Sequence, residues 1–430
     1  MQKPREIAVR LLKRHADGTG WLEDLLDLEF SKGTLAPADR GLVQELAYGV
    51  VRWQATLDWL IARKTGGRPQ KPVLQILLRL GLYQLFFLDR IPDHAAVHES
   101  VQLARDLGFG PQSGFVNAVL RNCLRERDSL ERDLQTLKDS SPDLGHSHPR
   151  WLCERWEQRW GAERLRALLD WNNAAPTVFL RVNTLKATPE QLAEELQREG
   201  VLFTPRTFDW APANLVFELR SHPPLATLNS FQNGHFYVQD PSTLLAVLEL
   251  APQPGETILD LCAAPGGKTT LIAQRMVNRG LVYAHDIEMR RLPLISENCA
   301  RLGAGNVKVI APEGLGSVAA PAAFDRILID APCSNTGVMR RRVELRWRIQ
   351  AAEIERLCGV QLGLLNQSAP WLKPGGSLVY STCSLEPDEN ANVVQEFLKS
   401  HSEFELVRER KLIPFIDGTD GAFVATLRKR

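Results

Sequence analysis

The sequence lacks the marks of membrane, secreted and metal-binding proteins. No apolar run reaches the length of a membrane span, and even the most apolar stretch, residues 73–88, is interrupted by Gln75, Arg79 and Gln84. The first residues carry charge but neither the apolar stretch nor the cleavage site of a signal peptide. The seven cysteines are widely spaced, without a CxxC pair, so neither a disulfide framework nor a metal site is indicated. We therefore expect a cytoplasmic protein whose thiols stay reduced.

The chain also lacks an excess of charge of either sign. Its 52 Lys and Arg nearly balance 51 Asp and Glu, for a formal net charge of +1. Any nucleic-acid binding must then come from local basic patches. The 430 residues exceed one comfortable core, and a hydrophobic content of 44% is typical of a globular protein, so two or three domains are expected.

The apolar pattern divides the chain into a helical front and an α/β back. Residues 1–128 show helical periodicity, and 129–148, which contain SSPDLGHSHP, predict a linker. Residues 149–235 mix helices with strand-like runs and predict a small α+β subdomain. From 236 to 430 strands and helices alternate, and strands are expected near 257–262, 281–286, 306–310, 324–330 and 376–382, before a closing antiparallel pair.

Two cysteines follow the central strands of the predicted sheet. RILID (326–330) precedes Cys333, and SLVYSTC (377–383) ends on Cys383. The carboxyl ends of parallel strands form the edge where ligands bind. Two thiols there suit covalent chemistry on an electrophilic ring, one attacking and one helping the adduct break down. The alternative for either cysteine alone is simple burial in a core.

A glycine-containing turn at residues 258–270, ILDLCAAPGGKTT, joins a predicted strand to a helix and favours a polar or anionic ligand. A phosphate-binding P-loop would need glycine at position 262, where the chain has Cys262. Asp286 lies 26 residues after Asp260 at the end of the next strand, well placed for ribose hydroxyls. The order of turn, acid and thiols points to an adenosine-containing cofactor.

Three motifs together resemble a known family. DLCAAPGGKTT (260–270), DAPCSNTGV (330–338) and STCSLEPDEN (381–390) are similar to those of the S-adenosylmethionine-dependent RNA cytosine-C5 methyltransferases of the NOL1/NOP2/Sun family. Residues 77–105 and 114–121 resemble the NusB-type RNA-binding domain. The resemblance implies a multidomain chain: an all-α NusB-like bundle, an RRM-like α+β subdomain, and a Rossmann-like α/β methyltransferase domain.

The resemblance also implies roles in methyl transfer. Cys383 would attack C6 of cytosine, Cys333 would assist release of the adduct, Asp330 would hold N3 and the exocyclic amine, and Lys268 would lie near base and thiol. The residues alone leave open which thiol attacks, because in related DNA enzymes the Pro-Cys thiol does so, which here is Cys333. The DNA alternative also predicts a duplex-reading domain between the cysteines.

S-adenosylmethionine is the implied cofactor. Asp286 would bind its ribose, Asp330 would border it, and Glu313 of APEG (311–314) stands where relatives carry Asp near the adenine. The turn that would wrap the methionine and ribose portions consists of Cys262, Ala263, Ala264, Pro265, Gly266, Gly267 and Lys268.

The implied partner is small-subunit (16S) ribosomal RNA, free or early in assembly, bound by a monomer. The basic segment 339–348 is expected to contact RNA and offers Trp347 for stacking, although Arg342, Val343 and Glu344 replace the His-Pro-Asp of relatives. A non-catalytic NusB-like RNA-binding or antitermination protein is the alternative. Such a protein would be expected to lose the thiols or Lys268.

Overall fold

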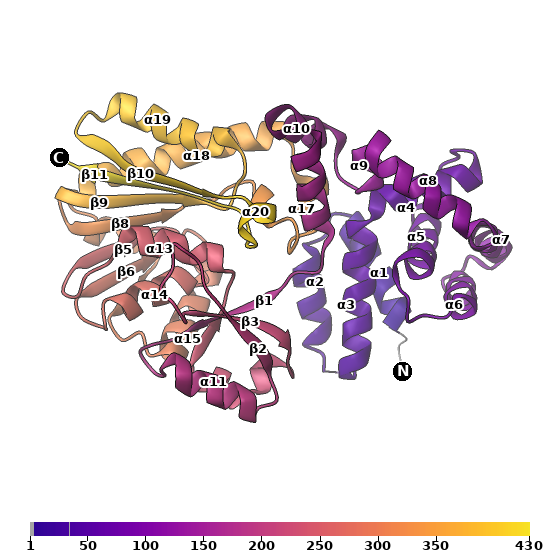
Figure 1. Cartoon of the computed structure of the whole chain (residues 1–430), viewed down its shortest axis with the longest axis horizontal. Coiled ribbons are helices and arrows are strands. Elements are labelled where there is room, and N and C mark those ends of the chain that lie inside the picture. The colour runs from indigo at the N-terminus through magenta and orange to yellow at the C-terminus, as the bar shows by residue number, and fades with distance from the viewer. Residues whose placement is uncertain (1–3, 34) are drawn as a thin grey trace. The chain divides into compact units, whose positions relative to one another are not determined.

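The computed structural model describes residues 4–33 and 35–430, which form two compact units. The first comprises the chain up to Ala174 together with Arg341–Arg348, and the second comprises Ala175–Arg340 and Ile349–Arg430 (Figure 1). Among the described residues, no helix combines the length and apolar character needed to cross a membrane.

The first unit is helical. Its core is built from buried leucines and valines of several helices. The packing is close enough to require glycine: a Cβ at Gly49 would lie 2.0 Å from the Tyr83 ring, and one at Gly81 would lie 2.7 Å from Leu120. The helices are α1 (Pro4–Ala16), α2 (Leu22–Phe30), α3 (Pro37–Arg52), α4 (Gln54–Thr65), α5 (Pro72–Phe87), α6 (Asp93–Asp106), α7 (Ser113–Arg125), α8 (Arg127–Ser140), α9 (Pro142–Gly145), α10 (Arg150–Asn173) and α17 (Leu345–Arg348).

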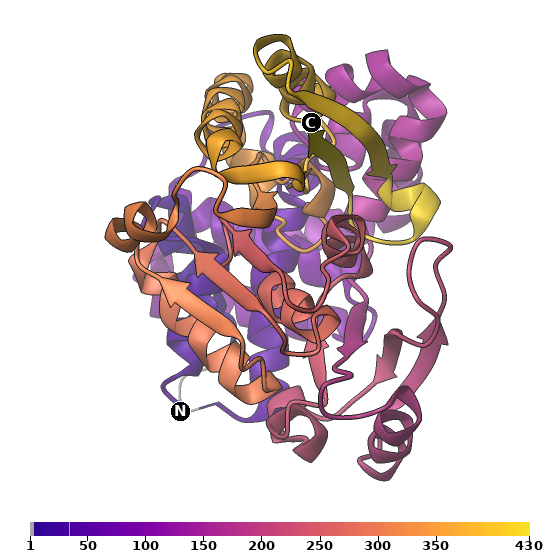
Figure 2. The ribbon, with the colours of Figure 1, turned by 90° about the vertical axis from the view of Figure 1, so that its left-hand side faces the viewer.

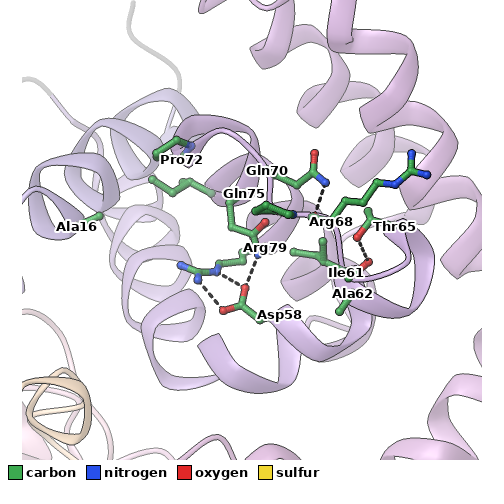
Figure 3. Close-up of a pocket in the computed structure, with 13 residues that line it drawn as sticks. Ala16, Asp58, Ile61, Ala62, Thr65, Arg68, Gln70, Pro72, Gln75 and Arg79 are labelled. Atoms are coloured by element: carbon green, nitrogen blue, oxygen red, sulfur yellow. Dashed lines mark hydrogen bonds and ion pairs between the residues drawn. The ribbon is translucent and has the colours of Figure 1, made fainter.

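A cavity of about 390 Å³ lies in this helical unit and is lined chiefly by α4, α5 and the turn between them (Figure 3). On its wall, Asp58 accepts hydrogen bonds from Gln75 at 2.5 Å and from Arg79 at 2.7 and 2.6 Å. The carboxylate of Asp58, on α4, is therefore paired with two side chains of α5. The cavity and the paired cysteines belong to different units.

The residues expected to form a linker are helical instead. Helix α8 covers 127–140 and α9 follows at 142–145, and Leu130 and Leu137 are buried. The polar composition of α8 obscured its helical pattern in the sequence, because only one face of the helix is packed against other residues. Helix α10, expected within the α+β subdomain, clusters with the helical unit, and its two halves meet at Gly161, where φ is 79°.

The basic segment differs most from expectation. Val343 is fully buried in the helical core, and the Trp347 indole donates to the Val51 carbonyl at 2.7 Å. Glu344 accepts from the Leu22 amide at 2.7 Å. The buried Arg346 donates from both terminal nitrogens to oxygens of the same unit, the carbonyls of Arg52, Ser147 and Asn172 and the side-chain oxygen of Asn173. The prediction of an exposed, RNA-contacting segment is therefore wrong for Arg346, which is buried inside the bundle, whereas Arg342 is exposed and its contact with RNA stays a prediction.

The second unit contains two sheets. The smaller is antiparallel, in the order β2-β3-β1-β4, from β1 (Val178–Val182), β2 (Leu202–Arg206), β3 (Val216–Ser221) and β4 (Phe236–Val238). Helix α11 (Pro189–Arg198) packs Leu192 and Leu196 into its core and begins with a Thr188–Gln191 capping box.

The larger sheet has seven strands in the order β10-β11-β9-β8-β5-β6-β7, and Figure 2 shows its twist. The strands from β5 to β9 are parallel, whereas β11 and β10 close the sheet in antiparallel pairing. Their bounds are β5 (Thr257–Asp260), β6 (Leu281–His285), β7 (Val307–Ile310), β8 (Phe324–Asp330), β9 (Leu372–Thr382), β10 (Phe404–Leu412) and β11 (Ala422–Lys429).

Helices cover both faces of this sheet (Figure 1). Leu328 and its like-facing neighbours pack with α13 (Leu244–Leu250) and α14 (Gly267–Arg275), whereas Ile327 and Ile329 pack on the side of α18 (Ala351–Ser368) and α19 (Ala391–Ser400). The face on which a side chain packs alternates along the strand, because successive strand residues point to opposite faces of the sheet. The chain builds β5, β6 and β7 in one direction and then returns to β8 on the other side of β5. Ligands bind at such a reversal, outside the carboxyl ends of the strands.

Candidate active site

The structure brings the two predicted thiols together at this edge. Strands β8 and β9 are parallel neighbours with Asp330 opposite Ser381. Cys333 follows three residues after the end of β8, and Cys383 follows directly after β9. The two Sγ atoms lie 3.3 Å apart, and both thiols are free. Two separate strand ends thus supply one pair of thiols.

Asn335 links the two cysteines, a role that the sequence did not indicate. Its backbone is left-handed, with φ of 58°, and its side-chain amide donates to the Cys333 carbonyl at 2.7 Å. The Cys383 thiol donates to Asn335 Oδ1 at 3.0 Å. Gly337 completes the contact, because its amide donates to the Cys383 carbonyl at 2.9 Å and a Cβ there would lie 2.6 Å from the same oxygen.

Lys268 and Asp330 form an ion pair beside the thiols. Lys268 Nζ lies 2.5 Å from Asp330 Oδ2, and the Ser381 hydroxyl donates to Asp330 Oδ1 at 2.7 Å. Burial disfavours the charge of Lys268, but Asp330 and then Cys383 outweigh it, so the pKa of Lys268 is raised. The Lys268 ammonium group therefore interacts electrostatically with Cys383 as well as with Asp330.

Glu389 is a second residue that the sequence analysis missed. It is fully buried and accepts hydrogen bonds from Ser334, next to Cys333, and from Ser384, next to Cys383. Its position in STCSLEPDEN was the available signal, since an acid that close to a strand-end thiol lies near the same edge.

The predicted cofactor turn leads from β5 into α14. Gly266 has φ of 101°, a conformation that favours glycine, and a Cβ on Gly267 would lie 2.8 Å from the Tyr237 ring. Burial strongly raises the pKa of the partly exposed Cys262 thiol, so that thiol stays protonated. The turn therefore offers close backbone approach rather than a reactive sulfur.

Two acids stand at the neighbouring strand ends. Asp286, just after β6, accepts from the amides of Ala264 and Glu288 at 3.0 Å each. It thereby ties its strand end to the glycine turn. Glu313, in the short helix η5 (Pro312–Gly314) that follows β7, is exposed.

Asp260, at the end of β5, is fully buried beneath this edge. Its Oδ2 accepts from the Thr269 hydroxyl at 2.7 Å, and its Oδ1 has no hydrogen-bond partner among the described residues. Burial, then the nearby acids, raise the pKa of Asp260 to about 7, while Thr269 opposes the shift. In the part of the chain that the structure describes, no cluster of three or more His, Cys, Asp or Glu is suited to a metal ion.

Family models match three successive parts of the chain. Residues 2–125 match the NusB family, residues 148–217 match the ferredoxin-like domain of RsmF/B-like methyltransferases, and residues 247–428 match the 16S rRNA methyltransferase RsmB/F model. The matches agree with the fold expected from the motifs: a helical NusB-like part, a ferredoxin-like α+β part and a methyltransferase domain.

Full-length relatives are similar over the same range. The chain is 34% identical to a probable ribosomal RNA small subunit methyltransferase B of Bacillus subtilis (strain 168), covering 99% of the chain and 98% of the relative. It is 36% identical to a protein of that description from Synechocystis sp. (strain ATCC 27184 / PCC 6803 / Kazusa), covering 100% of both. The crystal structure of PH0851 superposes with a TM-score of 0.80 at 26% identity, covering 100% of the chain and 99% of that structure. The chain therefore belongs to the ribosomal RNA small subunit methyltransferase B family.

Proposed function

We propose that this protein methylates C5 of a cytosine in 16S ribosomal RNA, using S-adenosylmethionine and a transient bond between Cys383 and C6. The observation that carries the proposal is the thiol pair, with its Sγ atoms 3.3 Å apart at the edge that also holds Lys268 and Asp330. Methyl transfer to a ring carbon that is a poor nucleophile needs such a covalent step.

The attack belongs to Cys383. Its thiolate bonds to C6, and the electron pair of the C5–C6 double bond moves into the ring, making C5 nucleophilic. Lys268 stabilises that thiolate, N3 takes up a proton from solvent as charge accumulates there, and Asp330 accepts hydrogen bonds from the protonated N3 and the exocyclic amine. S-adenosylmethionine, when bound, supplies a methyl group made electrophilic by its sulfonium.

Cys333 acts second, for an electrostatic reason. The hydrogen bond with Cys383, burial, and the charge of Cys383 raise the pKa of Cys333 well above its ordinary value. Once Cys383 is a neutral thioether, two of these influences disappear. Cys333 then loses its proton to solvent, and its thiolate takes the C5 proton as the electrons reform the C5–C6 bond and the C6–S bond breaks to restore the Cys383 thiolate.

The residues around the glycine turn fit the cofactor. Asp286 would accept hydrogen bonds from ribose hydroxyls, the turn from Cys262 to Lys268 would approach the methionine portion, and the buried Asp260 Oδ1 is an acceptor available to an ammonium group. Glu313 would stand beside the adenine, at the next strand end.

Recruitment of RNA is assigned to the other parts. We propose that the NusB-like bundle expected at 1–128 and the α+β subdomain expected at 149–235 bind 16S ribosomal RNA, as a monomer in the cytoplasm. The match of residues 2–125 to the NusB family supports this assignment.

The test is transfer of a radiolabelled methyl group from S-adenosylmethionine to 16S rRNA, protein-free and in 30S particles, followed by nucleoside analysis. We expect label in 5-methylcytidine and none with Cys383→Ala. Label at another base or position, or equal labelling by that variant, would refute the proposal.

A further inference from the structure

Glu389 lies beneath both thiol-bearing loops. It ends the short helix η8 (Pro387–Glu389), and its side chain is fully buried. Its Oε1 accepts from the Ser334 amide at 2.8 Å and from Gln361 Nε2 at 3.1 Å. Its Oε2 accepts from the Ser384 hydroxyl at 2.5 Å and from the Ser334 hydroxyl. One carboxylate therefore braces the residue after Cys333 and the residue after Cys383.

Among the residues that the structure describes, no cation forms an ion pair with Glu389. Its hydrogen-bond donors among the described residues are hydroxyl, amide and backbone groups, all neutral. Burial raises the pKa of Glu389, and the hydrogen bonds from Ser334, Ser384 and Gln361 oppose the shift. A buried carboxylate without a cationic partner is costly for the fold. Holding the two loops together would not by itself require a charged carboxylate, because an uncharged amide also accepts hydrogen bonds.

The charges around the thiol pair are asymmetric. The negative charge of Glu389 contributes to raising the pKa of Cys333, after the hydrogen bond to Cys383, burial and the charge of Cys383. The positive charge of Lys268 interacts instead with Cys383. Two thiols with Sγ atoms 3.3 Å apart thus experience opposite fields.

We infer that Glu389 is a positioning residue that holds the two thiol loops together and directs ionisation to Cys383, keeping Cys333 protonated until Cys383 has bonded to substrate. This inference rests on the proposed function, since only methyl transfer through Cys383 gives the order of ionisation a purpose. Without Glu389, both thiols would compete for the negative charge, and a Cys333 thiolate would repel the attacking one.

Other titratable groups also adjoin this cluster. Tyr380 donates its hydroxyl to the Glu389 carbonyl at 2.6 Å, and burial followed by the charges of Cys333, Glu389 and Cys358 raises its pKa. The pKa of Cys358 is likewise raised, to about 11, by burial and then by Glu389 and Asp388. On the other side the Lys268–Asp330 pair adjoins Cys383.

The test measures thiolate formation directly in the full-length protein without RNA or cofactor. Glu389→Gln keeps the size of the side chain and removes its charge. Each variant is treated briefly with iodoacetamide at pH 8, where a thiolate displaces iodide, and the labelled cysteines are counted by peptide mass spectrometry. Glu396→Gln is the matched control, because Glu396 is exposed on α19 and pairs only with Lys399 among the described residues.

We expect the ratio of Cys333 to Cys383 labelling to rise severalfold in Glu389→Gln, because loss of the Glu389 charge lowers the pKa of Cys333, and to stay unchanged in Glu396→Gln. Ser384→Ala removes a brace but keeps the carboxylate, so its ratio should follow the wild type. An unchanged ratio in Glu389→Gln, or an equal rise in Ser384→Ala, would overturn the charge assignment.

A second variant, Cys383→Ser, tests the inference if Glu389→Gln does not fold. In Cys383→Ser the influence of the Cys383 charge on Cys333 is gone while Glu389 remains. Cys333 should then still titrate above the ordinary thiol value of about 8.5, because burial and the Glu389 charge both remain, and an ordinary value would refute the inference. These assays need no methyl transfer, so they can fail while 5-methylcytidine is still formed, and the two proposals remain distinguishable.

Discussion

Replacing Arg346 by methionine tests whether this side chain anchors residues 341–348 in the helical unit. Arg346 is fully buried and donates hydrogen bonds of 2.8–3.2 Å to the carbonyls of Arg52, Ser147 and Asn172 and to Asn173 Oδ1. Each of these four oxygens loses a donor, at about 1–3 kcal/mol each. Part of that loss is offset, because none of these partners is a carboxylate and the buried charge costs free energy in the native protein. We expect a net destabilisation of about 2–5 kcal/mol.

The assay is calorimetric unfolding of the full chain. For a unit of this size the loss corresponds to a fall in melting temperature of about 5–15 °C, confined to the helical unit's transition. Arg342→Met is the matched control, since Arg342 is exposed in the same segment and the chemical change is identical. The control should shift stability by less than about 0.5 kcal/mol. Equal melting temperatures for the two variants would show that the segment is not anchored by Arg346.

Four further outcomes are expected. Cys383→Ala should abolish methyl transfer yet keep cofactor binding in calorimetry, and normal turnover would remove Cys383 from its role. Cys333→Ala should form the C6 adduct but not release it, giving a slow protein–RNA band on a denaturing gel; the same band from Cys383→Ala alone would reverse the assignment. Asp286→Ala should weaken S-adenosylmethionine binding by about 1–3 kcal/mol through lost charge-assisted hydrogen bonds, and an unchanged affinity would contradict the ribose contact. Removing residues 1–128 should leave a poorly soluble remainder, because Val343 loses the core that buries it; a soluble remainder with a single cooperative melt would argue against this.

The central strands could be predicted, and two edge strands could not. The five parallel strands lie within a few residues of the predicted ranges, because they show as short runs rich in apolar, β-branched residues, most of them buried in the interior of the sheet. Strands β2 and β4 were not assigned individually. They form the two edges of the four-stranded sheet, where β2 is mostly exposed and contains Pro205, and β4 has three residues. Edge strands carry a weak sequence signal, since one side needs no pairing.

The candidate site likewise contains residues that the sequence predicted and contacts that it did not. Motif residues such as Cys333, Cys383 and Lys268 were named from the sequence, because each stands at a fixed distance from a recognisable strand or turn. Their 3.3 Å thiol contact, and the supports given by Asn335 and Glu389, depend on how two loops 50 residues apart fold against each other. Local patterns do not encode that approach.

The sequence by itself determined the order of domains and the sheet and predicted the chemistry at its edge, because period, turn residues and motifs are local properties. Only the tertiary structure decided the fate of residues 341–348. Their run of arginines predicted an exposed, RNA-contacting surface, yet the segment lies within the helical unit, with Val343 and Arg346 buried. A charged side chain is expected to be exposed only where the fold provides no buried hydrogen-bond acceptors for it. Here the carbonyls that accept from Arg346 come from residues 52, 147 and 172, and only the folded chain gathers them around one guanidinium.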